Sequence, residues 1–134
     1  MAIQQSTALR NNIIGQIETT IGTAPQLKIR TGAQPANCAA ADSGTSLVTI
    51  TLASDWLTAA SGGSVSLIGT PSGTAGATGT AAHYRIYDST GTTCHEQGTV
   101  TVTGGGGDLT VDNTSISSSQ TVTLTSYSRT AGNA

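Results

Sequence analysis

Charged side chains are scarce in this chain: Lys, Arg, Asp and Glu make up 9% of its 134 residues, and the formal net charge is −2. Soluble domains usually devote about a quarter of their residues to these four types. Five Lys and Arg residues are too few for a surface that neutralises many phosphates, so we expect no nucleic-acid partner. Weak charge also gives little repulsion between copies, which favours packing in a homo-oligomer or a larger assembly.

Aromatic residues and long apolar runs are scarce too. Aromatic residues make up 3%, with no Phe, which argues against a sugar-binding surface. No stretch reaches the about 18 consecutive apolar residues of a membrane span. A signal peptide would begin with a basic and then an apolar region, but Gln4 and Gln5 follow Ile3 here. We therefore expect synthesis in the cytoplasm and no membrane partner.

The apolar residues that are present alternate with Thr or Ser, most clearly in segments 48–52, 99–102 and 121–125. Alternation of period two places one strand face in a core and the other in water. Seven or eight such segments, separated by Gly, Ser and Thr turns, predict a mainly β domain. We expect an antiparallel β-sandwich, of immunoglobulin-like or jelly-roll topology.

Several segments carry more specific expectations. In 82–88, His83, Arg85 and Tyr87 alternate with less polar residues and are predicted to face outward, and Cys94–Thr103 is predicted to return as the hairpin partner. Residues 69–80 indicate a flexible loop, and residues 127–134 a loose tail. The one tryptophan, Trp56, is expected in the core.

One helix is predicted before the β-domain, so that residues 1–25 form a helical segment and residues 26–134 the β-sandwich. Ser6 can cap its start, and Gly22 with Pro25 marks its end. Its apolar residues recur every four positions: Leu9, Ile13, Ile17 and Ile21. This stripe either packs on the sheet or docks the domain on a neighbouring subunit.

The only cysteines are Cys38 and Cys94. Cys94 has the parity of Val100 and Val102, so without a bulge its thiol points to the inner face. A disulfide to Cys38 would close a long loop, worth about 4 kcal/mol in the chain-entropy model. Thiols stay reduced in the cytoplasm but oxidise in a particle that leaves it, so a disulfide and two free thiols are both open. A cysteine nucleophile is not expected, because adjacent His95 should point the other way.

Catalytic and metal-binding groups are few. His83 and His95 lack a third ligand at a known spacing. Segment 104–112 matches a single calcium-binding nonapeptide, but such motifs share ions between stacked repeats. No Lys-Ser or Lys-Thr follows its glycines, as a phosphate loop would need. The aspartates are expected at turns: Asp42, Asp55, Asp88, Asp108 and Asp112. We predict no catalytic, cofactor-binding or metal-ligating residues, and no enzyme activity.

Residues for contact with other proteins are predicted on the helix and on outward strand faces. They are Ile3, Leu9, Ile13, Lys28, Arg30, His83, Arg85 and Tyr87.

Three stretches carry a family resemblance: 27–36 (LKIRTGAQPA), 79–88 (GTAAHYRIYD) and 107–116 (GDLTVDNTSI). In these stretches, and over most of its length, the chain resembles a group of small virion structural proteins of tailed bacteriophages and prophages. The resemblance implies a virion component with no catalytic residues to carry over. It leaves open which component.

Two structural roles follow from this resemblance. The first is a capsid decoration or cement protein that binds the major capsid protein and strengthens the shell. The second is a tail- or fibre-associated component that binds tail proteins or a host receptor. Small size, low charge and a static β-domain favour the first role, and the protein would then reside in the virion.

Overall fold

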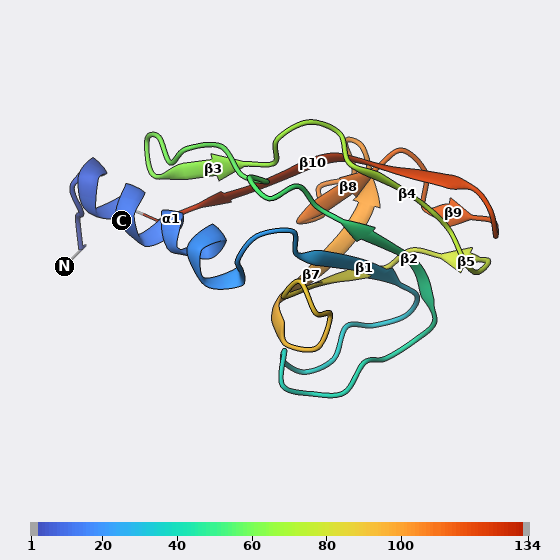
Figure 1. The fold of residues 1–134 in the computed structure, drawn as a ribbon. Coiled ribbons are helices and arrows are strands. Elements are labelled where there is room, and N and C mark those ends of the chain that lie inside the picture. Colours follow the sequence, from blue (N-terminus) through green and yellow to red (C-terminus); the bar gives the residue numbers. More distant parts are fainter. Residues whose placement is uncertain (1–2, 133–134) are drawn as a thin grey trace.

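The computed structural model describes residues 3–132, and within them one helix precedes ten strands (Figure 1). The elements are α1 (Thr7–Ile21), β1 (Gln26–Arg30), β2 (Ser46–Thr51), β3 (Ser64–Ser66), β4 (Ser72–Thr74), β5 (Gly79–Thr80), β6 (His83–Tyr87), β7 (Cys94–Val102), β8 (Leu109–Val111), β9 (Ser115–Ile116) and β10 (Thr121–Thr130). The fold is mainly β, with one N-terminal helix and a curled, sandwich-like sheet, and this confirms the predicted fold class.

Eight strands belong to one sheet. Seven follow the order β2-β1-β6-β7-β8-β10-β3, and β4 pairs with β10. Neighbours are antiparallel except β7 and β8, which are parallel. The sheet curls so that β3, β4 and β10 lie across from β1 and β2 (Figure 1). The two sides approach closely, since a Cβ added at Gly73 of β4 would lie 2.9 Å from Ile50 Cγ1 of β2. β5 and β9 pair separately.

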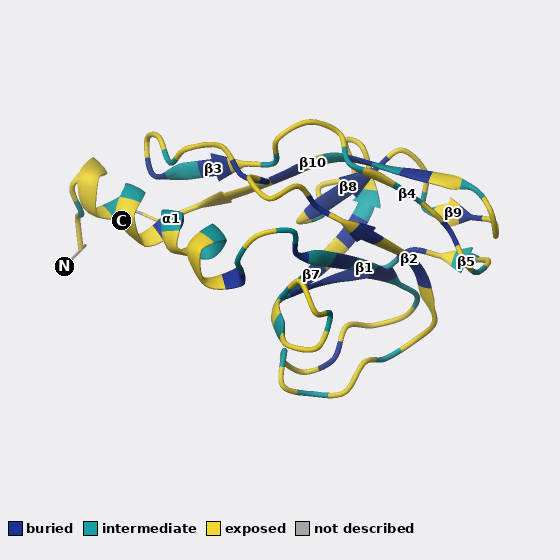
Figure 2. Cartoon of the chain, viewed as in Figure 1, coloured by how far each residue is buried: buried dark blue, intermediate teal, exposed yellow. Residues whose placement is uncertain are grey.

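The core fills the space inside this curl (Figure 2). Alternation places Leu27 and Ile29 of β1 inside, together with Val122 and Leu124 of β10, while the Thr and Ser residues that alternate with the apolar residues of β10 are more exposed. Trp56 is buried among these residues, as predicted, and its ring centroid lies 6.1 Å from that of Tyr127.

The predicted helix is confirmed. Ser6 caps its start, because the Ser6 hydroxyl accepts a hydrogen bond from Leu9 N at 3.2 Å. Gly22 ends it with a φ of 91°, a value that favours glycine. Of the apolar residues, Ile14 and Ile21 reach the core, whereas Leu9 and Ile13 stay about half exposed. The helix therefore packs on the domain through only part of its apolar surface.

Two predicted irregular segments are ordered instead. Segment 69–80 contains β4 and the start of the β5–β9 pair, because its small residues let the backbone lie close to β2 and β10. The predicted tail is largely strand, since β10 runs to Thr130 and Tyr127 is buried. Residues 133 and 134 of that tail, like residues 1 and 2, lie outside the described part.

The prediction that His83, Arg85 and Tyr87 face outward is wrong. All five residues of β6 are buried. One face of β6 meets the core, and the other is covered by residues 31–45, which we call the strap. The strap leaves β1, passes over this face and returns to β2 (Figure 1). Alternation gives the two faces of a strand but does not say whether a loop covers the second one.

Candidate functional site

The centre of the strap-covered face is Arg85, whose side chain is 1% exposed. Its guanidinium forms an ion pair with Asp42 of the strap. Nη2 donates to two strap carbonyls, Cys38 O at 2.8 Å and Ala40 O at 3.1 Å. Nε donates to Cys94 Sγ at 3.3 Å. A buried guanidinium needs this many partners, so Arg85 holds the strap in one conformation.

Asp42 joins three side chains from two strands. It accepts hydrogen bonds from Arg85 and from the Tyr87 hydroxyl, and Arg30 Nη1 lies 3.2 Å from its second oxygen. Burial alone would raise the pKa of Asp42, but the Tyr87 hydrogen bond and the two positive charges outweigh burial and lower it. Burial and the bond to Asp42 raise the pKa of Tyr87. Asp42 is therefore a structural anion rather than an acid that exchanges protons near neutral pH.

Two further side chains fasten the first half of the strap. His83 Nδ1 lies 2.7 Å from Gly32 O. Because a carbonyl oxygen only accepts, Nδ1 must carry the proton. Gln97 Nε2 donates to Pro35 O at 2.6 Å. His83 is thus a buried strap contact and not the exposed histidine that the sequence suggests.

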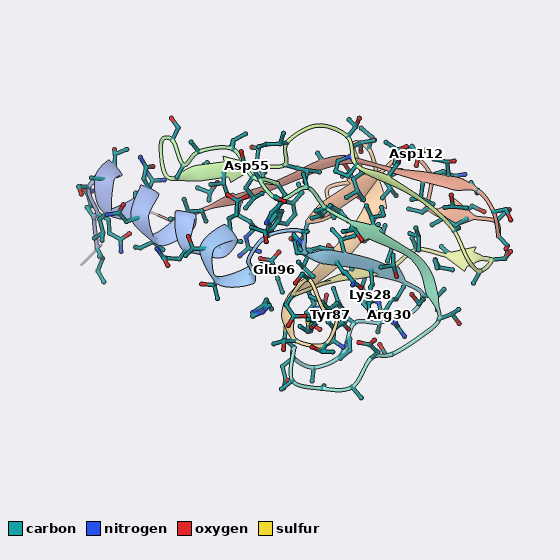
Figure 3. The ribbon with its side chains drawn as sticks, viewed as in Figure 1. Lys28, Arg30, Asp55, Tyr87, Glu96 and Asp112 are labelled. Atoms are coloured by element: carbon teal, nitrogen blue, oxygen red, sulfur yellow. The ribbon has the colours of Figure 1, made fainter. Side chains whose placement is uncertain are left out.

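Lys28 and Arg30 also turn toward the strap side of the sheet, where Figure 3 shows them beside Tyr87. Lys28 Nζ lies 4.2 Å from the centroid of the Tyr87 ring and donates to Gly91 O. Arg30 donates to Ser43 O at 2.8 Å and to Gly44 O at 3.1 Å. Both side chains are half-buried and make internal contacts, in addition to any role they have in binding another protein.

The two cysteines meet under the strap as free thiols. A register shift between Ile86 and Tyr87 pairs Cys94 with Tyr87 and turns it to the strap side. The predicted inward orientation of Cys94 is therefore wrong, and the bulge is the reason. Burial and a hydrogen bond with the Cys94 thiol raise the pKa of Cys38 to about 11. Both residues line a hollow of about 320 Å³ whose other walls include Asp42, Arg85 and Tyr87.

This hollow does not form a nucleophile site. Cys94 lies in it, whereas His95 lines a different hollow on the other side of β7. The hydrogen bonds of Arg85 go to the strap and to Cys94 of β7, so these donors are not directed at a ligand. Among residues 3–132, no three His, Cys, Asp or Glu side chains are placed to hold a metal ion together. The contacts of Arg85 and Asp42 fasten the strap to the sheet.

A second carboxylate, Glu96, whose side chain is 14% exposed, lies on the opposite side of β7, near the end of α1 (Figure 3). Its Oε1 accepts hydrogen bonds from Tyr84 at 2.7 Å and Tyr127 at 2.9 Å. Arg129 lies 3.5 Å from Oε2. Burial, then the charge and hydrogen bond of Glu96, raise the pKa of both tyrosines. Glu96 therefore joins β6, β7 and β10 and is fully engaged in doing so.

The remaining candidate is the outer face of α1. Ile3 is 73% exposed, Leu9 48% and Ile13 46%. Ile13 also borders a shallow hollow of about 280 Å³ formed with Ile17, Ile21 and the His95 region of β7. We call Ile3, Leu9 and Ile13 the α1 apolar face. The predicted contact residues thus divide into three that are exposed here and five that lie on the strap side.

The α1 apolar face carries no charge, because the two charged residues of the helix point elsewhere. Arg10 Nε donates to Ala131 O at 3.0 Å. Glu18 Oε1 accepts from Trp56 N at 2.7 Å and from Leu57 N at 3.1 Å. These contacts hold the helix against the domain and leave apolar side chains outside.

Sequence reasoning missed the carboxylates that organise the domain. The sequence predicts Asp42 at a turn, offers Glu96 only as a weak metal ligand beside the histidines, and indicates no role for Glu18. Charge balance is the signal that could have revealed Asp42. Arg85 lies between apolar neighbours in its strand, so its guanidinium needs a carboxylate partner if that strand face is covered.

Within residues 3–132, no helix is long and apolar enough to cross a membrane. Comparison of the chain with family models, with curated proteins and with solved structures found no match.

Proposed function

We propose that this chain is a structural protein of a tailed-phage virion, a decoration protein that binds the major capsid protein through the α1 apolar face and stabilises the shell. The observation that carries the proposal is that face itself. Three large aliphatic side chains lie exposed on and beside one helix, in a protein whose surface is otherwise mostly hydroxyl-bearing. Exposed apolar patches of this kind mark contact surfaces.

The rest of the molecule suits a mechanical role. The strap is tied down by Arg85 and Asp42, and Glu96 is saturated by two tyrosines. The polar side chains that chemistry would need are thus engaged in holding the fold together. A rigid domain with few charges can pack against a shell at high copy number without strong repulsion between neighbours.

Copy number and location test the proposal directly. Quantitative mass spectrometry of purified virions, and of separated heads and tails, measures both. We expect hundreds of copies per particle, confined to heads. A few to a few dozen copies, confined to tails, would overturn the decoration role and support the alternative of a tail- or fibre-associated component.

A matched pair of variants tests the surface. Ile13→Asp places a charge on the α1 apolar face, whereas Val102→Asp changes a residue that is similarly exposed, at 44%, but lies at the end of β7 opposite to His95 and the hollow beside α1. Binding to heads that lack the protein should fall more than tenfold for Ile13→Asp and stay unchanged for Val102→Asp, with both variants folded by circular dichroism. Equal binding by the two variants would show that the α1 apolar face is not the contact.

A further inference from the structure

Cys38 and Cys94 are 56 positions apart in the sequence, yet the strap brings both of them to the wall of one hollow. The same guanidinium holds both residues, because Arg85 donates to Cys38 O at 2.8 Å and to Cys94 Sγ at 3.3 Å. Neither residue is sealed in the core. Both are partly exposed and line the hollow of about 320 Å³ under the strap.

This placement leaves one reaction for the pair. A metal ion would need a third ligand, and the part of the chain described here places none beside the thiols. A nucleophile would need a base, and His95 lies on the other side of the strand. Two thiols that line one hollow open to solvent can instead be joined by an oxidant.

We propose that Cys38 and Cys94 are an oxidation site that closes to a disulfide once the protein leaves a reducing compartment, and that this bond locks the strap onto β7. The inference concerns the chain itself and does not depend on a virion role. It selects one of the two states that the sequence leaves open and assigns the bond its effect on the strap.

A low-molecular-weight disulfide such as oxidised glutathione supplies the oxidising equivalents. One cysteine, as thiolate, attacks a glutathione sulfur, which forms a mixed disulfide and releases one reduced glutathione. The second cysteine then attacks its neighbour's sulfur and releases the other. Two S–H bonds are lost and one protein S–S bond forms, while two electrons and two protons end on two glutathione molecules. Because the second cysteine lines the same hollow, the intramolecular step outruns further reaction with glutathione.

The bond would act on stability as well as on the strap. It closes a long loop that runs from the strap to β7, which constrains the unfolded chain. In the chain-entropy model, a loop of this length raises the Tm of a domain of this size by on the order of 10 °C. An attack that starts from Cys38 will be slow near neutral pH, because the thiol of Cys38 has a raised pKa of about 11.

The test uses the full chain, purified under reducing conditions and then incubated at pH 8 with oxidised glutathione. Intact mass should fall by two hydrogens, non-reducing peptide mapping should find Cys38 joined to Cys94, and Tm should rise. Cys38→Ser and Cys94→Ser should each gain one glutathione instead, and neither should show the Tm rise.

Wild-type protein that keeps two free thiols, or that carries glutathione on either cysteine at equilibrium, would overturn the proposal. So would an intramolecular bond that leaves Tm unchanged, because the bond would then not constrain the strap. If one serine variant is too unstable to study, the other variant and the wild-type mapping still decide. None of these outcomes bears on copy number in virions, so the two proposals fail independently.

Discussion

At the residue scale, the domain is held together by a few charged groups in places where the sequence suggests solvent. Arg85 is buried beneath the strap, and Asp42 neutralises it while also contacting Arg30 and Tyr87. Removing one member of such a group leaves the other charge buried and incompletely paired, which costs more than the pair contributes.

Asp42→Asn should therefore destabilise the fold. We expect a loss of about 2 kcal/mol at pH 7, less than for a fully buried pair because the Asp42 side chain is 33% exposed. The pKa of Asp42 is lowered in the folded state, so its contribution is complete above the unfolded-state pKa of about 3.9 and is lost as pH falls below that value. The difference between the variant and wild type should shrink accordingly below about pH 4.

Urea unfolding at pH 7 and at pH 3 measures both effects. The matched control is Asp55→Asn, which removes the same charge from an exposed residue and should cost less than about 0.5 kcal/mol. If the two variants are equally stable at pH 7, Asp42 does not hold the strap.

How far the sequence predicts individual residues depends on what decides their environment. The burial of Trp56 follows from its residue type, and the cap at Ser6 follows from the neighbouring sequence. Both predictions are confirmed. The orientation of Cys94 depends on a bulge that no local pattern announces. His83 is buried because the strap passes over β6, and this packing is a tertiary contact. For the same reason the cluster around Arg85 could not be assembled from the sequence.

At the element scale, the strap is the feature that alternation and turn signals miss. Its sequence indicates a polar loop. Its two ends are joined by a hydrogen bond, in which Thr31 N donates to Thr45 O. The close approach depends on Gly44, which has a φ of 66° and whose added Cβ would lie 1.9 Å from Thr31 O. Gly32 has a similar φ of 75° but has nothing within 4 Å of that position.

Alanine substitutions at Gly32 and Gly44 distinguish the free-energy cost of a positive φ from that of a steric clash. Gly32→Ala should cost about 1 kcal/mol, the price of a positive φ alone. Gly44→Ala adds a clash with backbone and should cost about 3 kcal/mol or more, with the strap displaced. Urea unfolding gives the energies, and the rate at which a thiol reagent labels Cys38 reports strap displacement. Similar costs and similar labelling in the two variants would mean that the strap does not need its close contact at Gly44.

The helix behaves differently from the strap, because local signals locate it correctly while its packing comes from elsewhere. Periodicity places Leu9 and Ile13 on one stripe with Ile17 and Ile21, but the stripe divides between core and solvent. Which part of a helix is covered depends on where the sheet ends, and the helix sequence does not contain that information.

At the scale of the whole molecule, α1 and both sides of the curled sheet share one apolar core. Ile14 and Ile21 belong to the same buried cluster as Trp56. Glu18 adds a polar link, because its carboxylate accepts the backbone N–H groups of Trp56 and Leu57. A domain of this size with one core is expected to unfold in a single transition. Folding should be slow, in milliseconds to seconds, because β1 pairs with β6 and β3 with β10 across long stretches of chain.

The helix should therefore open only when the whole domain opens. In native-state hydrogen exchange under reducing conditions, the most protected amides of α1 and of β10 should report the same free energy. Glu18→Ala leaves two N–H groups without their acceptor, which should cost roughly 3 kcal/mol, and α1 should then exchange ahead of β10. Glu18→Gln keeps an acceptor oxygen and should preserve most of the coupling. If α1 already exchanges at a lower free energy than β10 in the wild-type protein, its two buried isoleucines and Glu18 do not join it to the core, and α1 moves independently of the sheet.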